Sequence, residues 1–247
     1  MSMEVSRRGG TAILALVVTV SIGCASSQGF DRAAISEALQ IDLDRNDDQP
    51  PASPASTLSL PFRLGVFFAD HDIPTGQSIR KVEWLGADRD QLLRLLAPLQ
   101  DKQILTETVV LMDATLQGKN ILAIRQAGAR YGAGAVLIVE GAAAVDRYNN
   151  RYAWLYPTWI GAYFAPGTES SALVALTGSL WEVQSERQLP TQAVEGVAKS
   201  VGPAVFVEDD GVVTQAKEAA IKALSERIID QLHLLKEELP HAELRSR

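Results

Sequence analysis

The chain has 247 residues, of which 47% are hydrophobic, and its 23 Lys and Arg against 30 Asp and Glu give a formal net charge of −7. This length fits one large domain or two small ones, and the apolar fraction is sufficient for a packed core. No stretch concentrates positive charge, which argues against a nucleic-acid-binding surface, because such surfaces need many phosphate contacts. The single cysteine, Cys24, excludes an intrachain disulfide and a cysteine-based zinc site.

The N-terminus has the pattern of a secretory signal. Arg7 and Arg8 precede an apolar run over residues 11–22, which is shorter than the ~20 residues that a membrane-spanning helix needs. A basic start, a short apolar core and small residues behind it are typical of a signal peptide. Gly23-Cys24 then resembles the lipobox of bacterial lipoproteins, in which the signal is cleaved before the cysteine and the thiol carries diacylglycerol. The resemblance implies that residues 1–23 are removed and that Cys24 is lipidated.

One position departs from the lipobox pattern, because Ser21 stands where a leucine is usual. An ordinary secretory signal with an incidental cysteine therefore remains an alternative. Ala25 follows the cysteine, and lipoproteins without Asp at that position usually reach the outer membrane. The expected location is thus the outer membrane, facing the periplasm, with Cys24 as the membrane anchor.

Residues 24–60 are predicted to be a flexible tether. The stretch DLDRNDDQPPASPAS is acidic and then rich in Pro and Ser, with little apolar surface to pack. Residues 33–39 could form one or two helical turns. A flexible segment of this length spans roughly 30–35 Å, which would hold a folded domain away from the membrane. We expect that domain at residues 61–239, followed by a tail at 240–247.

The first half of the folded region alternates between strand and helix patterns. Strands are predicted at 62–69, 104–112 and 135–145 from their β-branched and aromatic residues, and helices at 86–100 and 120–134 from apolar residues on one face. Asp88 is placed to cap the first helix. Such a βαβαβ order favours a sheet with helices packed against it.

The second half is predicted to be an antiparallel meander followed by a long helix. The strands are expected near 151–164, 171–183 and 188–201, separated by turn sequences, and apolar residues spaced by three and four predict a helix at 211–238. The predicted fold class is therefore α/β (α+β): one mixed sheet built from a βαβαβ unit and a β-meander, with helices and a long C-terminal helix packed on it.

The stretch YAWLYPTWIGAYFAPG is the most distinctive part of the sequence. Seven of the fifteen aromatic residues lie between positions 148 and 164. Three interpretations remain open: an aromatic core beneath the meander, a surface for protein contact or the membrane interface, and a small-ligand pocket around Trp154 and Trp159. The candidate partner-contact residues are Tyr152, Trp154, Tyr156, Trp159 and Tyr163.

The sequence offers little that indicates chemistry. Asp70-His71-Asp72 follows the first strand, where α/β proteins often place metal or acid–base sites, but we favour a solvated loop that turns off the strand. Glu140 and Asp146 are carboxylates in or near a strand, and nothing in the sequence pairs them; Glu208 belongs to the stretch EDDG, which is interpreted as a helix cap. Phosphate-binding loops and nucleophile elbows do not occur. We therefore predict no catalytic residue, no cofactor and no metal.

Several segments resemble known envelope proteins. LPFRLGVFF, AIRQAGARYGAGAVLIVEG and ALTGSLWEVQSERQLP are similar in pattern to a periplasmic α/β domain found in the N-terminal part of TolB and in lipoprotein activators of penicillin-binding proteins. With WIGAYFAPG, the order of features resembles the rhombotarget lipoprotein family. That resemblance implies a link to a rhomboid-type protein-sorting system, without a defined molecular role.

These observations lead to three hypotheses about function. The first is a membrane-anchored envelope lipoprotein that acts by contact with an unidentified envelope protein, through a sheet edge or the aromatic stretch. The second is a carrier of a small apolar ligand, which would need a sizeable pocket near Trp154 and Trp159. The third is a carboxylate-dependent hydrolase, which would need the loop at Asp70 to cluster with Glu140 or Glu208.

Overall fold

The computed structural model describes residues 27–40, 58–70, 79–116 and 120–245. The predicted signal peptide, the lipobox with Cys24, and His71 and Asp72 lie outside the described residues, as do positions 41–57 of the predicted tether.

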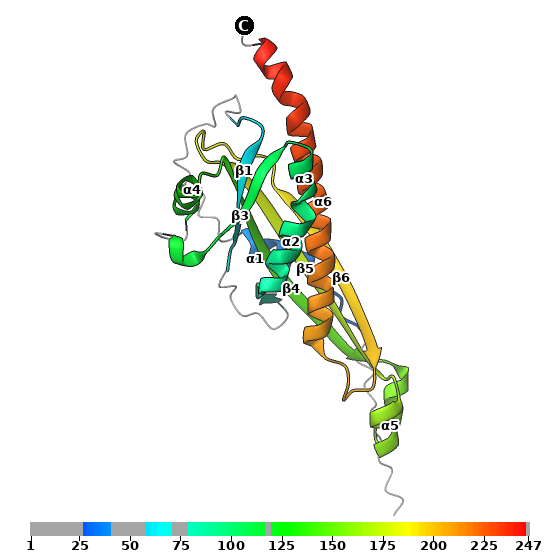
Figure 1. Ribbon diagram of the computed structural model, residues 1–247. Helices are drawn as coiled ribbons and strands as arrows, with labels where there is room; N and C mark the ends of the chain where they lie inside the picture. Colours follow the sequence, from blue (N-terminus) through cyan, green and yellow to red (C-terminus); the bar gives the residue numbers. More distant parts are fainter. Residues whose placement is uncertain (1–26, 41–57, 71–78, 117–119, 246–247) are drawn as a thin grey trace, which may run out of the picture.

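A six-stranded mixed sheet forms the centre of the molecule (Figure 1). Its strand order is β3-β1-β4-β5-β6; β1 runs parallel to β3 and β4, whereas β4, β5 and β6 are antiparallel. The short β2 pairs antiparallel with β4 beyond the end of β1. The strands are β1 (Phe62–Phe68), β2 (Ile79–Lys81), β3 (Leu105–Leu111), β4 (Ala135–Asn149), β5 (Thr168–Glu182) and β6 (Gln192–Gly202).

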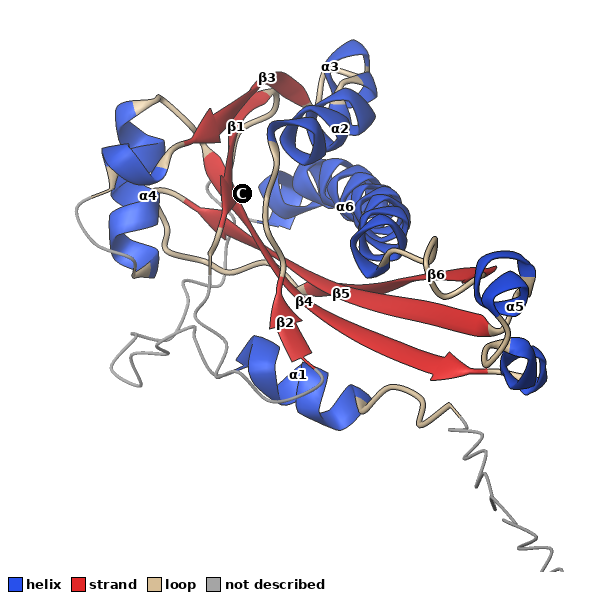
Figure 2. Cartoon of the chain, turned by 90° about the horizontal axis from the view of Figure 1, so that it is seen from below, coloured by secondary structure: helices blue, strands red, loops and turns tan. Residues whose placement is uncertain are grey.

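The helices lie on both faces of this sheet (Figure 2). One face is covered by α2, α3 and α6, and the opposite face by α4 and α1. The helices are α1 (Arg32–Gln40), α2 (Gly86–Leu96), α3 (Pro98–Asp101), α4 (Ile121–Arg130), α5 (Trp159–Phe164) and α6 (Asp209–Arg245), with short 3₁₀ helices η1 (Asp113–Thr115) and η2 (Arg151–Leu155).

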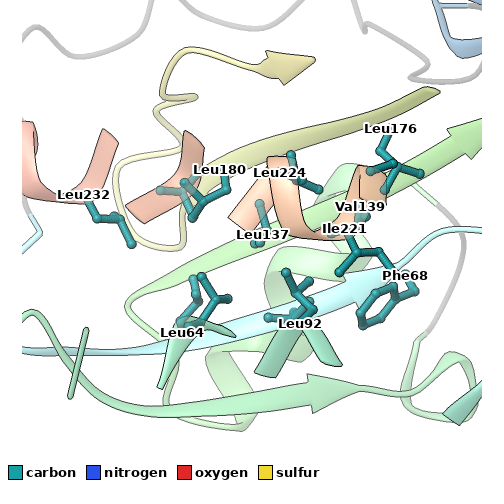
Figure 3. Close-up of a cluster of buried hydrophobic side chains, with 14 of the residues drawn as sticks. Leu64, Phe68, Leu92, Leu137, Val139, Leu176, Leu180, Ile221, Leu224 and Leu232 are labelled. Atoms are coloured by element: carbon teal, nitrogen blue, oxygen red, sulfur yellow. The ribbon is translucent and has the colours of Figure 1, made fainter. Parts of the chain in front are cut away.

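The largest core lies between the sheet and the α2–α3–α6 layer (Figure 3). Alternate residues of β4 and β5 point into it, among them Leu137 and Leu176, because successive strand side chains face opposite sides. On α6, Ile221, Leu224 and Ile228 recur at spacings of three and four and are buried against the sheet. This periodicity explains why a long amphipathic helix could be predicted from the sequence.

The predicted fold class is confirmed: a mixed sheet carries helices on its faces and a long C-terminal helix. The details differ at three places. The short β2 was missed, and α6 extends to Arg245, so the prediction of a separate tail from residue 240 is wrong. The predicted strand over 151–164 is also wrong. The first strand of the meander is β4, which continues to Asn149 and pairs with β5 along its full length.

The prediction of a tether over all of residues 24–60 is wrong for its first described part. Helix α1 lies on the sheet and buries Ile35 and Leu39 against small residues of β4 and β5. Arg32 forms an ion pair with Glu195 of β6 at 3.0 Å between Nε and Oε2. The few apolar residues of this acidic segment share one helix face, so they suffice to dock a single short helix. Leu58, at the other end of the segment, is also buried in the main core.

Candidate functional site

The aromatic stretch forms two short helices that project from the end of the sheet (Figure 1). Asn149 pairs with Thr168, so residues 150–167 form the connection of a long hairpin and have no strand partner in the sheet. Aromatic residues favour strands only where neighbouring strands can pack against them. The spacing of Trp159 and Ile160 to Tyr163 and Phe164, four residues each, was the sequence signal for a helix.

Specific local contacts build these helices. The side-chain oxygen of Asn150 accepts a hydrogen bond from the backbone N–H of Tyr152 at 2.9 Å, and the Thr158 hydroxyl accepts one from Gly161 at 3.0 Å. Both are N-terminal caps of the kind that Asn and Thr provide. A Cβ at Gly161 would lie 1.9 Å from the carbonyl oxygen of Leu155. Only glycine therefore allows α5 to pack against η2 this closely.

The exposed apolar side chains at this end form a surface that we call the aromatic tip. Trp159 is 86% exposed and Phe164 78% exposed, so the interpretation as an aromatic core is wrong. The loop between β6 and α6 contributes further apolar side chains to the same end. Its Phe206 ring lies 6.3 Å from that of Tyr163 in an edge-on arrangement. The tip consists of Trp154, Trp159, Ile160, Tyr163, Phe164, Val205 and Phe206.

The five predicted contact residues have different roles in this arrangement. Trp154, Trp159 and Tyr163 belong to the tip, whereas the exposed Tyr152 ring is covered by the guanidinium of Arg151 at 5.0 Å. Tyr156 is half-buried, and its hydroxyl lies 2.8 Å from that of Thr168 at the start of β5. Tyr156 thus connects the tip to the sheet. Four further residues of the tip were not predicted from the sequence: Ile160, Phe164, Val205 and Phe206.

A polar cluster lies where the tip joins the sheet. Glu169 of β5 accepts hydrogen bonds from the Lys199 ammonium at 2.5 Å, the Tyr148 hydroxyl at 2.5 Å and the Asn150 amide at 3.1 Å. These three bonds, that of Lys199 foremost, lower the pKa of Glu169 from 4.5 to about 2. The same carboxylate raises the pKa values of Tyr148 and Lys199 through its hydrogen bonds to them. The cluster therefore joins β4, β5 and β6 at the base of the tip.

We expect Glu169→Gln to remove part of the pH dependence of folding stability. The folded-state pKa is depressed, so the ionised carboxylate stabilises the fold above pH 4.5, and this contribution is lost as the pH falls toward 2. Lys199 is half exposed, which limits the effect to about 1 kcal/mol. Urea unfolding at pH 7 and pH 3 measures it: the stability difference between wild type and variant should shrink at the lower pH. An unchanged difference would contradict the predicted pKa.

A second candidate site is a groove on the face that carries α1. Its volume is about 750 Å³, and Ser36 and Leu39 of α1 border it together with side chains of β5 and β6. Glu140 lies in its floor, and the Thr177 hydroxyl donates to that carboxylate at 3.4 Å. Trp154 and Trp159 do not line this groove. The two tryptophans also do not line a second hollow, of about 650 Å³, between β2 and α6.

The structure describes only part of the set that a carboxylate-dependent hydrolase would need, because His71 and Asp72 lie outside the described residues. Asp70 forms an ion pair with Lys81 at 3.2 Å, whereas Glu140 lies in the floor of the groove beneath α1. Glu208 directly precedes α6. Over the described residues, no group of three or more His, Cys, Asp or Glu side chains is arranged to hold a metal ion.

The outer edge of β6 is a third feature that could bind another molecule. Among the described strands, β6 pairs only with β5, so this strand of eleven residues ends the sheet. Val197 and Val201 are exposed on the face that carries α1, and Lys199 lies between them. A long edge strand presents unpaired backbone groups to which an extended segment of another chain can add.

No helix in the described part of the chain combines the length and the apolar character needed to cross a bilayer. No protein-family model matches the sequence, and neither does any curated protein. Distant likenesses exist among solved structures. A protein described as a neuraminyllactose-binding hemagglutinin homologue from Helicobacter pylori has a TM-score of 0.35 and 13% identity, over 74% of this chain and 89% of that one.

Two further structures are similar at the same level. A Xanthomonas campestris protein of the DUF330 family has a TM-score of 0.34 and 10% identity, over 76% of this chain and 97% of that one. A protein described as a lipoprotein from Caulobacter crescentus has a TM-score of 0.29 and 12% identity, over 63% of this chain and 88% of that one. Likenesses of this size identify neither a family nor a function for the chain.

Proposed function

We propose that this protein is a lipid-anchored protein of the bacterial outer membrane that acts by binding another envelope protein. The observation that carries the proposal is the edge of β6 that pairs with no other described strand, with eleven residues in the strand and exposed Val197 and Val201 on it. An extended segment of a partner could pair with this edge and place apolar side chains against the two valines. Cys24 would supply the anchor, as the lipobox pattern predicts.

The groove beside β6 adds a second element to this binding surface. Ala193 and Glu195 of β6 line it, and their side chains lie on the same face as those of Val197 and Val201. A strand added at the edge would therefore lie next to this groove, whose polar and apolar side chains could select side chains of the partner. The resemblance to the rhombotarget family suggests that the partner belongs to a rhomboid-type protein-sorting system.

The experiment is photo-crosslinking in cells that produce the full-length protein. We expect a crosslinking residue at Val197 to capture one defined envelope protein, and we expect Val201→Lys or Cys24→Ala in the same protein to abolish this capture. Edge lysines oppose strand addition, and loss of the lipid would release the protein from its membrane. The matched control is a crosslinking residue at Leu122, which is 51% exposed on α4.

The outcomes separate the parts of this proposal. Capture at Val197 and not at Leu122 would support the edge as the binding surface. If neither position yields a defined protein, binding through β6 is wrong. If Cys24→Ala leaves the protein in the outer-membrane fraction, lipid anchoring at Cys24 is wrong.

A further inference from the structure

We propose that the aromatic tip lies in the interfacial layer of the membrane, next to the lipid anchor, so that the domain rests on the bilayer. This inference depends on the lipidation of Cys24 put forward above. It differs from the sequence expectation, in which a flexible tether holds the domain roughly 30–35 Å from its anchor.

The path of the chain from α1 back to Ser27 runs toward the end of the sheet that carries the tip. The Ser27 hydroxyl donates to Oδ2 of Asp146 at 2.5 Å, and the backbone N–H of Gly29 donates to the same oxygen at 3.2 Å. Asp146 lies three residues before Asn149, the last residue of β4. At ~3.4 Å per strand residue, Asp146, which Ser27 contacts, is therefore about 10 Å along β4 from the point at which the chain enters η2.

The position of Ser27 is supported by the docking of α1. Ile35 is 2% exposed beneath this helix. The Asp31 carboxylate accepts a hydrogen bond from the backbone N–H of Ala34 at 3.0 Å, and Arg32 pairs with Glu195 of β6. Because α1 is fixed in this way, the residues directly ahead of it start from a defined place on the sheet.

The length of chain between Ser27 and the anchor is short. Cys24 precedes Ser27 by three residues, and three extended residues span at most about 10–11 Å. This reach is similar to the length of about 10 Å along β4 from Asp146, which Ser27 contacts, to the end of the strand. The acyl chains on Cys24 would enter the bilayer beside this end of the sheet, and the surface beyond it, which is the aromatic tip, would meet the same bilayer.

The side chains of the tip suit that environment. Trp and Tyr concentrate at membrane–water interfaces, and apolar residues such as Ile and Phe enter the boundary of the acyl chains. The tip presents Trp154, Trp159 and Tyr163 together with Ile160 and Phe164. Seven exposed apolar side chains at one end of a domain form a patch that soluble surfaces rarely leave uncovered.

The charges near the tip indicate that apolar burial would drive the contact. Arg151 adjoins the tip, but its guanidinium lies over Tyr152. The acidic residues near the tip are Glu208, Asp209 and Asp210, and Asp209 is paired with Arg147 at 3.3 Å. This balance does not favour anionic lipid, so membrane contact should depend little on salt or on lipid charge.

The test uses the full-length lipidated protein in phosphatidylcholine vesicles that contain phosphatidylcholine brominated on its acyl chains. Bromine quenches tryptophan fluorescence at short range, and the chain has four tryptophans. Trp181 is buried, and the Trp84 indole donates to the carbonyl of Ala69 within the fold. We expect strong quenching in the wild type and its loss in the variant with Trp154→Phe and Trp159→Phe.

A second variant tests membrane contact with both reporters retained. Ile160→Asp combined with Phe164→Asp places two charges in the tip, and we expect the quenching to fall sharply. Leu122→Asp, a change at another exposed apolar residue, on α4, should leave it unaltered. Quenching in the wild type should also be the same when the salt is raised from about 0.05 to about 0.5 M.

The experiment distinguishes a tip that stays out of the membrane from a protein that has no lipid anchor. Protein that floats with the vesicles but shows no quenching would be anchored without its tip in the membrane, and the proposed function would stand. Protein that does not float with the vesicles would refute the lipid anchor itself. In cells, a crosslinking residue at Ile160 should form lipid adducts, and a defined protein captured there instead would assign the tip to a protein partner.

Discussion

Gly196→Ala should destabilise the protein by about 3 kcal/mol or more, at the high end of what overpacking a buried contact costs. A Cβ at this position of β6 would lie 2.1 Å from the carbonyl oxygen of Ala216 and 2.5 Å from the backbone nitrogen of Ala220 in α6. Both alanines are fully buried. The strand and the helix meet backbone to backbone here, so the new methyl group could be accommodated only if the helix moved away from β6.

Urea unfolding of the wild type and two variants measures this effect. Gly211→Ala is the matched control, because nothing lies within 4 Å of a Cβ there and the residue is in the first turn of α6. Alanine favours the helix over glycine, so this control should be neutral or more stable by up to about 1 kcal/mol. A Gly196→Ala protein that unfolds at the wild-type urea concentration would contradict the close contact between β6 and α6.

The sequence predicts those parts of the fold whose hydrophobic period is unambiguous. The spacing of apolar residues on α6 indicates a helix, and the run at β1 indicates a strand through its short length and its β-branched and aromatic residues. The three residues of β2 are too few to show a period, and they are held by pairing with β4. Gly196 could not be identified as a contact residue, because its neighbours in space are twenty and twenty-four positions away.

The candidate sites were less accessible to sequence reasoning because they depend on strand register. Residues 150–167 are excluded from the sheet only because Asn149 pairs directly with Thr168. The cluster of Glu169 with Tyr148 and Lys199 needs three strands in their observed alignment. The tip residues Val205 and Phe206 join α5 through the fold alone, since some forty positions separate them in the chain.

The tether prediction shows how composition alone can mislead. A polar, proline-rich segment such as residues 24–60 cannot form a core of its own. Helix α1 needs no core of its own, because alanines of β4 and β5 leave room for Ile35 and Leu39 on the sheet. The docking of nine residues changes the functional inference, since it moves the predicted anchor from a distant position to the edge of the folded domain.

Lys217→Met should also destabilise the protein strongly, by about 3–5 kcal/mol, because it would leave a buried carboxylate without its counter-charge. The Lys217 ammonium of α6 lies 2.6 Å from Oδ2 of Asp88 in α2, and each side chain is only 6% exposed. The ammonium also donates to the carbonyl of Glu83 at 2.8 Å, and Asp88 accepts from the backbone N–H of Leu85 at 2.8 Å. Asp88 therefore caps α2, as predicted, but from its third residue, and it ties this helix to α6.

A double-mutant cycle separates the buried charges from the packing. Asp88→Asn alone retains an acceptor for Leu85 but leaves the ammonium buried without an anion, so it should cost about as much as Lys217→Met. The double variant contains neither charge, so it avoids the costly state in which one buried charge lacks its partner. We expect it to be more stable than either single variant in urea unfolding. If the two single losses instead add in the double variant, Asp88 and Lys217 contribute independently and the pair does not join α2 to α6.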